Sequence, residues 1–352
     1  MNTPEQRVNA YITHWYKQWS KVQDEMGDNV DFDYWGALIA EVDDLHFVEG
    51  SDSGTSRSFG FKADFDPHLA KITECEIQGE SAQVFTETYD ETLKTTDYHV
   101  WELTFNAEQG WRISTILELL RPPKSLAINP KEHVSILAMS HPDAPFLARE
   151  DHIDLNENTL FQNDRKINIP NMLSAQSKGL TVLKELGRLQ VATGVLGILD
   201  FAYDIYNFQP LHRKVKAGNY PVQAVMIYNR VAGVRIRFNP QEQPVKWYAA
   251  NTAKGNGVYG VDAGNLAIFD VNSLLKLRCL QKEQIFTDWC NLAQPQLVSL
   301  AVTNDCLITP SGFGDGAYPA FWGVNAKDEI VSLYIDFMIL VEENKDGLYQ
   351  SI

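Results

Sequence analysis

The chain has 352 residues and a mass of 39.8 kDa, more than one compact domain usually needs, so we expect two domains. Hydrophobic residues make up 44% and charged residues 22%, which excludes a wholly disordered chain. No apolar run reaches the ~18 residues that span a bilayer, and the N-terminus lacks a signal-peptide pattern. The four cysteines are dispersed without a CxxC pair, which argues against a disulfide framework. We therefore expect a cytoplasmic protein without membrane association or cofactor.

The negative charge is concentrated in the first third of the chain. Residues 1–120 contain 23 acidic and 8 basic residues, so they carry −15 of the total net charge of −16. Such a surface repels phosphates and attracts cationic proteins, so we expect no direct contact with nucleic acid. The alternative, that the acidic surface only maintains solubility, stays open.

The first third is predicted to hold two helices followed by four strands. Apolar residues recur at helical spacing from Val8 to Met26 and again from Trp35 to Val42. After Gly60 the apolar period changes to two, which predicts antiparallel strands. The expected strands cover residues 71–77, 82–89, 99–105 and 111–119. This order predicts an α+β domain.

Two pairs of short motifs carry a family resemblance in this domain. They are the run ITECEIQGESAQV at 72–84, and Trp101-Glu102-Leu103 leading to Gly110-Trp111-Arg112-Ile113. Over about residues 5–120 the chain resembles the nuclear-transport-factor-2-like cone fold, most closely the subgroup described as immunity proteins. The resemblance implies a cone-shaped domain of helices and antiparallel sheet. Because this fold also hosts isomerases, dehydratases and scaffolds, it does not fix the function.

The proline pair Pro122-Pro123 ends the first domain, which we place at residues 1–124, with a linker over 125–150. Residues 151–352 are predicted to form a mainly β domain. Its expected strands are 187–199, 221–228, 234–238, 245–250, 258–269, 297–302 and 330–341, with a hairpin turn at 229–233 and a helix at 281–292.

Five separated motifs in the second domain keep a specific order. They are Gly218-Asn219-Tyr220-Pro221-Val222, Gly260-Val261-Asp262-Ala263-Gly264 with Phe269-Asp270, the run SGFGDGAYP at 311–319, Trp322-Gly323 and Asp336-Phe337. Over about residues 150–345 this order resembles the bacterial domain of unknown function 4241. Thr193-Gly194 and Asp200 also fit, although Phe201 stands where the family usually has proline. The resemblance implies a family and no activity.

Known catalytic patterns are missing from the sequence. There is no HExxH, no P-loop and no GxGxxG opening a helix, and no histidine lies beyond His212. The best candidate set for a ligand or metal is the group of motif carboxylates and one tyrosine: Asp262, Asp270, Asp315, Tyr318 and Asp336. They could bind a hard cation, form an acid–base pair, or bind backbone N–H groups in glycine-rich turns. All three interpretations stay open.

The acidic residues of the first domain are the candidate partner-binding set. Those at the end of the first predicted helix, in the loop after it and at the end of the second are Asp24, Glu25, Asp28, Asp31, Asp33, Glu41, Asp43 and Asp44. Acid at a helix C-terminus opposes the helix dipole, so a partner would give a reason to keep it. We expect an immunity or antitoxin-like protein that neutralises a basic toxic effector by tight binding. The alternatives are an enzyme or a small-ligand or metal-binding protein that uses the carboxylates of the second domain, and a scaffold.

Overall fold

The computed structural model describes residues 3–26, 31–51, 59–60, 62–149, 151–152, 157–168, 178–203, 205, 208–289 and 292–352. The chain is mixed helix and sheet. It divides into two compact units, Met1–Ser125 and Leu126–Ile352. Each unit buries a hydrophobic core of its own.

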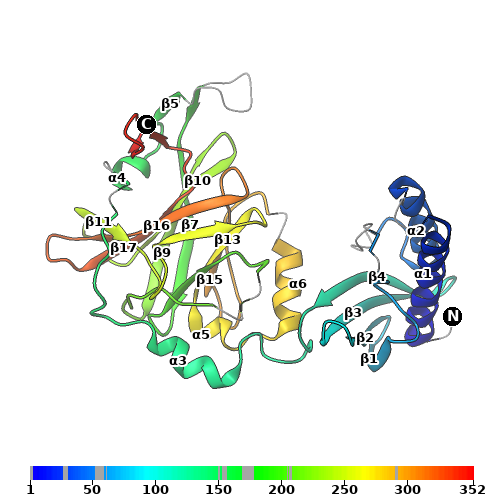
Figure 1. Cartoon of the computed structure of the whole chain (residues 1–352). Coiled ribbons are helices and arrows are strands. Elements are labelled where there is room, and N and C mark those ends of the chain that lie inside the picture. The colour runs from blue at the N-terminus through cyan, green and yellow to red at the C-terminus, as the bar shows by residue number, and fades with distance from the viewer. Residues whose placement is uncertain are drawn as a thin grey trace. The chain divides into compact units, whose positions relative to one another are not determined.

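Two helices open the first unit and lie side by side on one face of its sheet (Figure 1). α1 (Pro4–Met26) starts with a proline, which suits the first turn because its missing N–H would have no helical partner there. α2 (Phe32–His46) follows Asp31, whose side chain accepts hydrogen bonds from two backbone N–H groups of the first turn. The helices run antiparallel, since Tyr11 of α1 donates a hydrogen bond to Asp43 near the end of α2.

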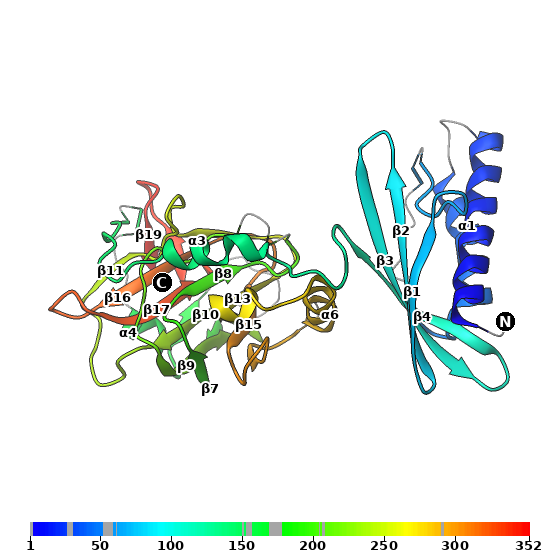
Figure 2. The ribbon, with the colours of Figure 1, turned by 90° about the horizontal axis from the view of Figure 1, so that it is seen from below.

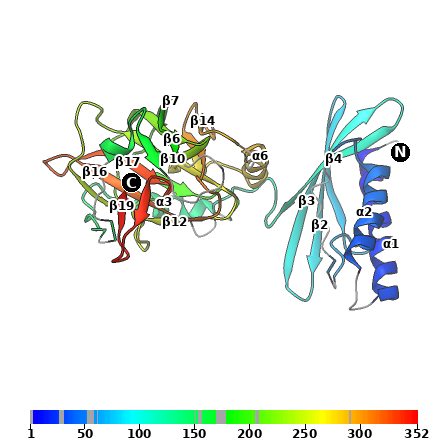
Figure 3. The same ribbon diagram turned by 90° about the horizontal axis from the view of Figure 1, so that it is seen from above.

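Four antiparallel strands form the sheet of the first unit, in sequence order. They are β1 (Lys71–Gln78), β2 (Ser81–Asp90), β3 (Thr95–Asn106) and β4 (Gly110–Leu119). One face of this sheet packs against the apolar sides of α1 and α2 (Figures 2 and 3). The core between them is aromatic, because Trp15, Trp35 and Trp101 are each at most 1% exposed. Both helices and all four strands that the sequence predicts are therefore present.

The second unit contains two main antiparallel sheets. The larger has seven strands in the order β11-β16-β17-β10-β9-β7, with β12 pairing with the first half of β16, and the smaller has the order β14-β15-β13-β8. The larger sheet comprises β7 (Val182–Val191), β9 (Gly218–Ile227), β10 (Arg230–Arg237), β11 (Lys246–Ala249), β12 (Val258–Val261), β16 (Gly316–Val324) and β17 (Ile330–Asp336). The smaller comprises β8 (Leu196–Leu199), β13 (Asn265–Asp270), β14 (Gln296–Val298) and β15 (Cys306–Pro310).

Short hairpins and helices complete the second unit. The hairpins pair β5 (Lys166–Asn168) with β6 (Lys178–Leu180), and β18 (Val341–Glu343) with β19 (Tyr349–Ser351). The helices are a 3₁₀ turn (Pro130–Glu132), α3 (His133–Ala138), α4 (Glu157–Leu160), α5 (Val271–Leu274) and α6 (Cys279–Trp289).

The central strands of the larger sheet, β10, β16 and β17, are buried on both faces over most of their length. On one face, Val234 and Leu333 share a core with Ile268 of the smaller sheet. On the other face, the rings of Phe321 and Tyr334 stack with centroids 5.1 Å apart, in a second core that α4 helps to form. Strands buried on both faces show continuous apolar runs instead of alternation. Seven of the eight positions of β10 are accordingly buried.

The turn between β9 and β10 differs from the predicted one at 229–233. Tyr228 and Asn229 form it alone, with φ of 52° and 60°. Two central residues with positive φ are what a type I′ hairpin requires, so the strand resumes at Arg230.

Two predicted strands are each divided between the two sheets. Residues 187–199 form the end of β7 and all of β8, because the chain turns at Gly194, where φ is +78°. A side chain at Gly194 would overlap the carbonyl oxygen of Val215, so only glycine fits this turn. Residues 258–269 likewise form β12 and most of β13, with a turn at Gly264 where φ is +66°.

Other predicted elements differ in extent. The strand expected at 297–302 covers only Gln296–Val298, and the one at 330–341 ends at Asp336. The helix expected at 281–292 is α6, which ends at Trp289, and the two residues after it lie outside the described part.

β15 and β16 were not expected from the sequence. Glycines at 312–316 indicate a loop, and no alternation follows them, because the second half of β16 is buried on both faces. Tyr318 and Pro319 therefore lie inside a strand, whereas the sequence suggested a turn.

The segment expected as a linker packs onto the second unit. Ala127 donates its backbone N–H to the carbonyl of Leu277, and His141 does the same to His212, both at 2.8 Å. Leu147 forms a further backbone bridge with Ala249. Residues 126–149 thus belong to the second unit, which begins at Leu126. Among the described helices, none is both long and apolar enough to cross a membrane.

We expect residues 1–125 and 126–352 to fold when they are expressed separately, because each holds a complete core. Cooperative thermal unfolding of each fragment, followed by circular dichroism, would check this. The matched control is residues 151–352, which lack the backbone pairs of 126–149 and should melt at a lower temperature than 126–352. Equal melting temperatures for these two fragments would contradict the assignment of 126–149 to the second unit.

Candidate functional site

The acidic residues at the start of α2 have a structural role. Asp31 is the N-cap and accepts hydrogen bonds from the backbone N–H groups of Asp33 and Tyr34, at 3.0 and 3.2 Å. Asp33 lies in the first turn, where negative charge favours the helix dipole. The expectation that these two aspartates oppose the dipole of the preceding helix is therefore wrong, because α2 begins earlier than its apolar pattern indicates.

The other candidate acids divide into bonded and exposed side chains. Asp43 accepts a hydrogen bond from the hydroxyl of Tyr11 at 3.2 Å, and Asp28 lies outside the described residues. Four are exposed on the two helices: Asp24, Glu25, Glu41 and Asp44. We call these four the helix-pair carboxylates.

Lys21 is a basic residue within the same helix surface. It donates a hydrogen bond to the hydroxyl of Tyr34 at 2.7 Å. Tyr34 and the charges of Glu25 and Glu41 raise the pKa of Lys21. The helix surface is therefore a mixed one with an acidic excess.

A buried cation joins both helices to the sheet. Arg7 is 6% exposed and donates to the carbonyl oxygens of Trp111 at 2.6 Å and Leu45 at 3.1 Å. Its Nη1 also lies 3.4 Å from Nδ1 of His46. Because arginine only donates, that nitrogen of His46 must accept, and its Nε2–H then donates to Nδ1 of His14 at 2.8 Å.

This arrangement keeps His46 neutral. Burial, followed by the charges of Arg7 and His14, lowers the pKa of His46 to about 4. No local pattern in the sequence indicates the contact of Arg7, His14 and His46, because the three residues belong to two helices that meet only after folding.

His99 lies in the aromatic core of the first unit. Its ring is 5.2 Å from that of Phe65 and 6.1 Å from that of Trp101, and among the described residues its Nδ1 has no hydrogen-bond partner. Burial lowers its pKa to about 4. A neutral, enclosed imidazole of this kind is a core residue.

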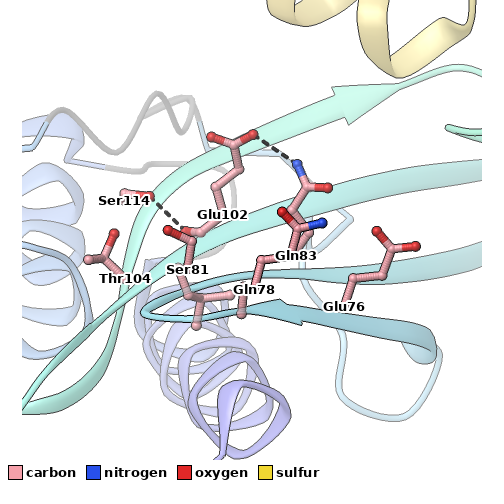
Figure 4. Close-up of a pocket in the computed structure, with 9 residues that line it drawn as sticks. Glu76, Gln78, Ser81, Gln83, Glu102, Thr104 and Ser114 are labelled. Atoms are coloured by element: carbon pink, nitrogen blue, oxygen red, sulfur yellow. Dashed lines mark hydrogen bonds between the residues drawn. The ribbon is translucent and has the colours of Figure 1, made fainter.

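The outer face of the first sheet, opposite the helices, contains a hollow of about 370 Å³ (Figure 4). The polar side chains in it come from all four strands. The side chain of Gln83 donates to Glu102 at 3.2 Å, and the hydroxyl of Ser114 donates to the carbonyl of Glu102 at 3.0 Å. The residues that line it are Glu76, Gln78, Ser81, Ala82, Gln83, Glu102, Leu103, Thr104 and Ser114.

Three residues of the candidate set in the second unit, Asp270, Tyr318 and Asp336, bind backbone groups. Asp270 caps α5 and accepts from the N–H of Thr193 at 2.8 Å, which explains why both occur in the motif pattern. Tyr318 is buried and donates to the carbonyl of Gly314 at 2.8 Å. These contacts are turn and cap interactions.

Asp336 is also enclosed. It is 1% exposed and accepts from the hydroxyl of Tyr334 at 3.0 Å and the N–H of Met338 at 2.7 Å. Burial raises its pKa to about 6.

Asp262 and Asp315 remain exposed on neighbouring loops. The loops are joined by the N–H of Ser311, which donates to the carbonyl of Gly264 at 3.0 Å. Burial and the charges of Asp262, Asp200 and Asp315 raise the pKa of Tyr203. Asp200 itself accepts two backbone N–H groups of the 262–263 turn. In the described ranges, no three acidic, histidine or cysteine side chains converge as a metal site.

The second unit contains a buried polar network that was not predicted from the sequence. Glu157 is fully buried, pairs with Arg235 at 3.3 Å and accepts from the hydroxyl of Ser332 at 2.5 Å. A Cβ at Gly323 would stand 2.9 Å from the Glu157 carboxylate, so this glycine makes room for it. The Trp322-Gly323 motif was the one available signal, and its partner lies far away in sequence.

The first unit should lose stability as the pH falls from about 7 toward 4. The folded pKa values of His46 and His99 lie below the unfolded value of about 6.5, so acid favours the unfolded chain. We expect about 2 kcal/mol from His99 alone at pH 4.5. Urea unfolding of the full chain, followed by tryptophan fluorescence, should show a smaller loss for His99→Leu. As a control, His68→Gln changes an exposed histidine and should keep the wild-type dependence of the unfolding free energy on pH. If that pH dependence were the same in His99→Leu as in the wild type, this account would be contradicted.

Replacing the motif aspartates one at a time should distinguish those that stabilise the fold from those that are exposed. Asp270→Ala removes the α5 cap and the bonds to Thr193, so we expect a loss of about 2 kcal/mol. Asp262→Ala removes an exposed carboxylate and should change stability by less than about 0.5 kcal/mol. Thermal unfolding measures both. Saturable heat on addition of Ca²⁺ or Mg²⁺, lost in Asp262→Ala, would instead support the metal alternative.

The comparisons with known proteins support the second motif pattern. Residues 189–335 match the model of the family described as Protein of unknown function (DUF4241). The comparison with curated proteins and the comparison with solved structures each returned no match. Over residues 189–335, the second unit therefore carries the domain of unknown function that its motifs predicted.

Proposed function

We propose that this is an immunity or antitoxin-like protein that neutralises a basic toxic effector by tight association through its acidic first unit. The exposed helix-pair carboxylates are the observation that carries the proposal. α1, α2 and the cap of α2 together hold eight acidic and three basic residues. Toxic nucleases are often basic because they bind nucleic acid, and an acidic surface would steer such a protein and cover the same patch.

The arrangement of the first unit supports the resemblance behind this proposal. Two helices on one face of a four-stranded antiparallel sheet agree with a nuclear-transport-factor-2-like cone. Fewer acidic residues oppose a helix dipole than the sequence predicted, because Asp31 and Asp33 stabilise the start of α2. Asp24 and Glu25 lie in the last turn of α1 and Asp44 in the last turn of α2, where negative charge is unfavourable to the helix. Retention of these side chains is easier to understand if a partner uses them.

The alternative of an enzyme or small-ligand protein depends on the second unit. Of its candidate residues, Asp262 and Asp315 are the ones that stay exposed. A ligand of that site would have to engage the two glycine-bearing loops. The protein-binding proposal has more exposed charge in its favour.

The proposal predicts that a basic polypeptide co-elutes with the protein purified from its own host. With that partner, association should slow steeply as salt rises, since exposed charges are screened within about 8–10 Å. The combined change Asp24→Asn, Glu25→Gln, Glu41→Gln and Asp44→Asn should slow association at least tenfold. The melting temperature should stay equal or rise.

A matched control removes the same charge from the second unit. The control variant changes four exposed acidic residues of the second unit to their amides: Asp164, Glu342, Glu343 and Asp346. This variant should associate at close to the wild-type rate. Equal slowing by both variants would mean that net charge, and not the helix surface, controls the encounter, and insensitivity of both to salt would sink the proposal.

A further inference from the structure

One dipeptide of the second unit combines a reactive side chain with an open backbone position. The loop between β11 and β12 contains Asn256-Gly257, which is the one asparagine–glycine pair in the sequence. Asn256 is exposed, as are the three residues before it, whereas Gly257 is buried. Because glycine has no Cβ, the side chain of the preceding residue can approach its backbone nitrogen closely. Such a pair allows the side chain to react with the main chain.

The carboxamide of Asn256 is held next to the backbone that follows it. Its Oδ1 accepts a hydrogen bond from the N–H of Val258 at 3.1 Å. This contact closes an Asx turn, which folds the side chain over the peptide bond between Asn256 and Gly257. In the described part of the chain, the N–H of Gly257 donates no hydrogen bond. The nitrogen of Gly257 is thus available to attack the side-chain carbonyl carbon.

Packing requires glycine directly after Asn256. At Gly257 φ is +82°, and a Cβ there would stand 2.9 Å from the Cβ of Ala249 and 3.3 Å from the backbone nitrogen of Ala250. The carbonyl of Gly257 also accepts from the N–H of Ala320 in β16, at 2.9 Å. A side chain at position 257 would be strained and would push the loop away from β11. The fold therefore keeps the small residue that makes the pair reactive.

We propose that Asn256 is a site of spontaneous deamidation in the folded protein. The nitrogen of Gly257 loses its proton to solvent and forms a bond to Cγ of Asn256, and the side-chain nitrogen leaves as ammonia. The N–H of Val258 stabilises the negative charge that develops on Oδ1 during the attack. The product is a five-membered succinimide, which water opens at either carbonyl. Opening at one carbonyl gives aspartate and at the other isoaspartate, and water is the only other reactant.

Both products add one negative charge, and isoaspartate also changes the backbone. In isoaspartate the chain runs through the former side chain, which inserts one carbon atom between residues 256 and 257. The longer chain must still enter β12, which pairs with the first half of β16. Because contacts with Ala249 and Ala320 fix Gly257, the insertion should weaken this pairing. The site goes beyond the proposed function, since it requires neither a partner nor the helix-pair carboxylates.

Mass spectrometry of aged protein locates the reaction. The full-length protein is incubated at pH 8 and 37 °C in water labelled with ¹⁸O, and is then digested at low pH in unlabelled water. Opening of the succinimide by labelled water adds ¹⁸O to residue 256, which distinguishes reaction in the folded protein from reaction during digestion. Electron-transfer fragmentation separates aspartate from isoaspartate. We expect both products at residue 256, formed at least tenfold faster than at Asn272, which precedes a serine and lies within α5.

Two variants separate the reaction from its consequence. Asn256→Gln should keep its mass and its melting temperature through the same incubation, because glutamine would have to close a less favourable six-membered ring. Asn256→Asp carries the charge of the product without the added carbon atom, so the freshly purified variant should melt close to the wild type. The wild type should lose melting temperature in proportion to its content of isoaspartate.

Three outcomes would overturn the inference. The first is that residue 256 takes up no label in the time in which a peptide of residues 251–261 reacts completely. The second is at least tenfold faster reaction in guanidinium chloride, since the fold would then protect Asn256. The third is an unchanged melting temperature in protein rich in isoaspartate, which would refute the effect on β12. None of these results bears on association with a protein partner, which tests the proposed function.

Discussion

Buried charged side chains that bond to the backbone hold both units in shape. In the first unit, Arg7 donates to carbonyl groups that end α2 and begin β4. In the second, Asp305 is fully buried and accepts from three successive backbone N–H groups at residues 300–302. An unpaired buried charge is costly, so these contacts fix the chain at points where regular structure stops. The helix pair of the first unit and the loop between β14 and β15 both depend on them.

This constraint limits what the carboxylates of the second unit can do chemically. A carboxylate that already accepts several backbone N–H groups has few lone pairs left for a metal or a proton transfer. Asp200 and Asp270 are of this kind, and each joins segments distant in sequence. Their positions in the motif pattern are explained by the turns they hold. Asp262 and Asp315 are different, since their side chains face solvent on adjacent loops.

The first unit carries most of its exposed carboxylates outside an aromatic core. Its interior holds two neutral histidines and the buried Arg7, whereas the helix-pair carboxylates stand on the helices, and Glu76 and Glu102 on the outer face of the sheet. Binding of a cationic partner to the helix-pair carboxylates would therefore leave the core unchanged. Such a division allows a stable scaffold to carry a strongly acidic exterior at little cost in packing.

The sequence by itself determined the elements of the first unit, because most of them bury one face and polar residues mark the other. Helical spacing in α1 and alternation in β2 are local properties, visible without a partner. The same rule failed for β16, which is buried on both faces in its second half and follows glycines that indicate a loop. It also missed the pairing of Glu157 with Arg235 and Ser332, since no local pattern links residues so far apart.

Only the tertiary structure decided the roles of the candidate residues. The sequence predicted that Asp31 and Asp33 oppose the dipole of the first helix. In the structure, Asp31 caps α2 and Asp33 lies in its first turn, where negative charge favours the dipole of α2. The array of Glu76, Gln83 and Glu102 exists only through the pairing register of three strands. Periodicity fixes which face a side chain takes, whereas its neighbours across strands and helices follow from long-range packing, which the order of residues along the chain does not reveal.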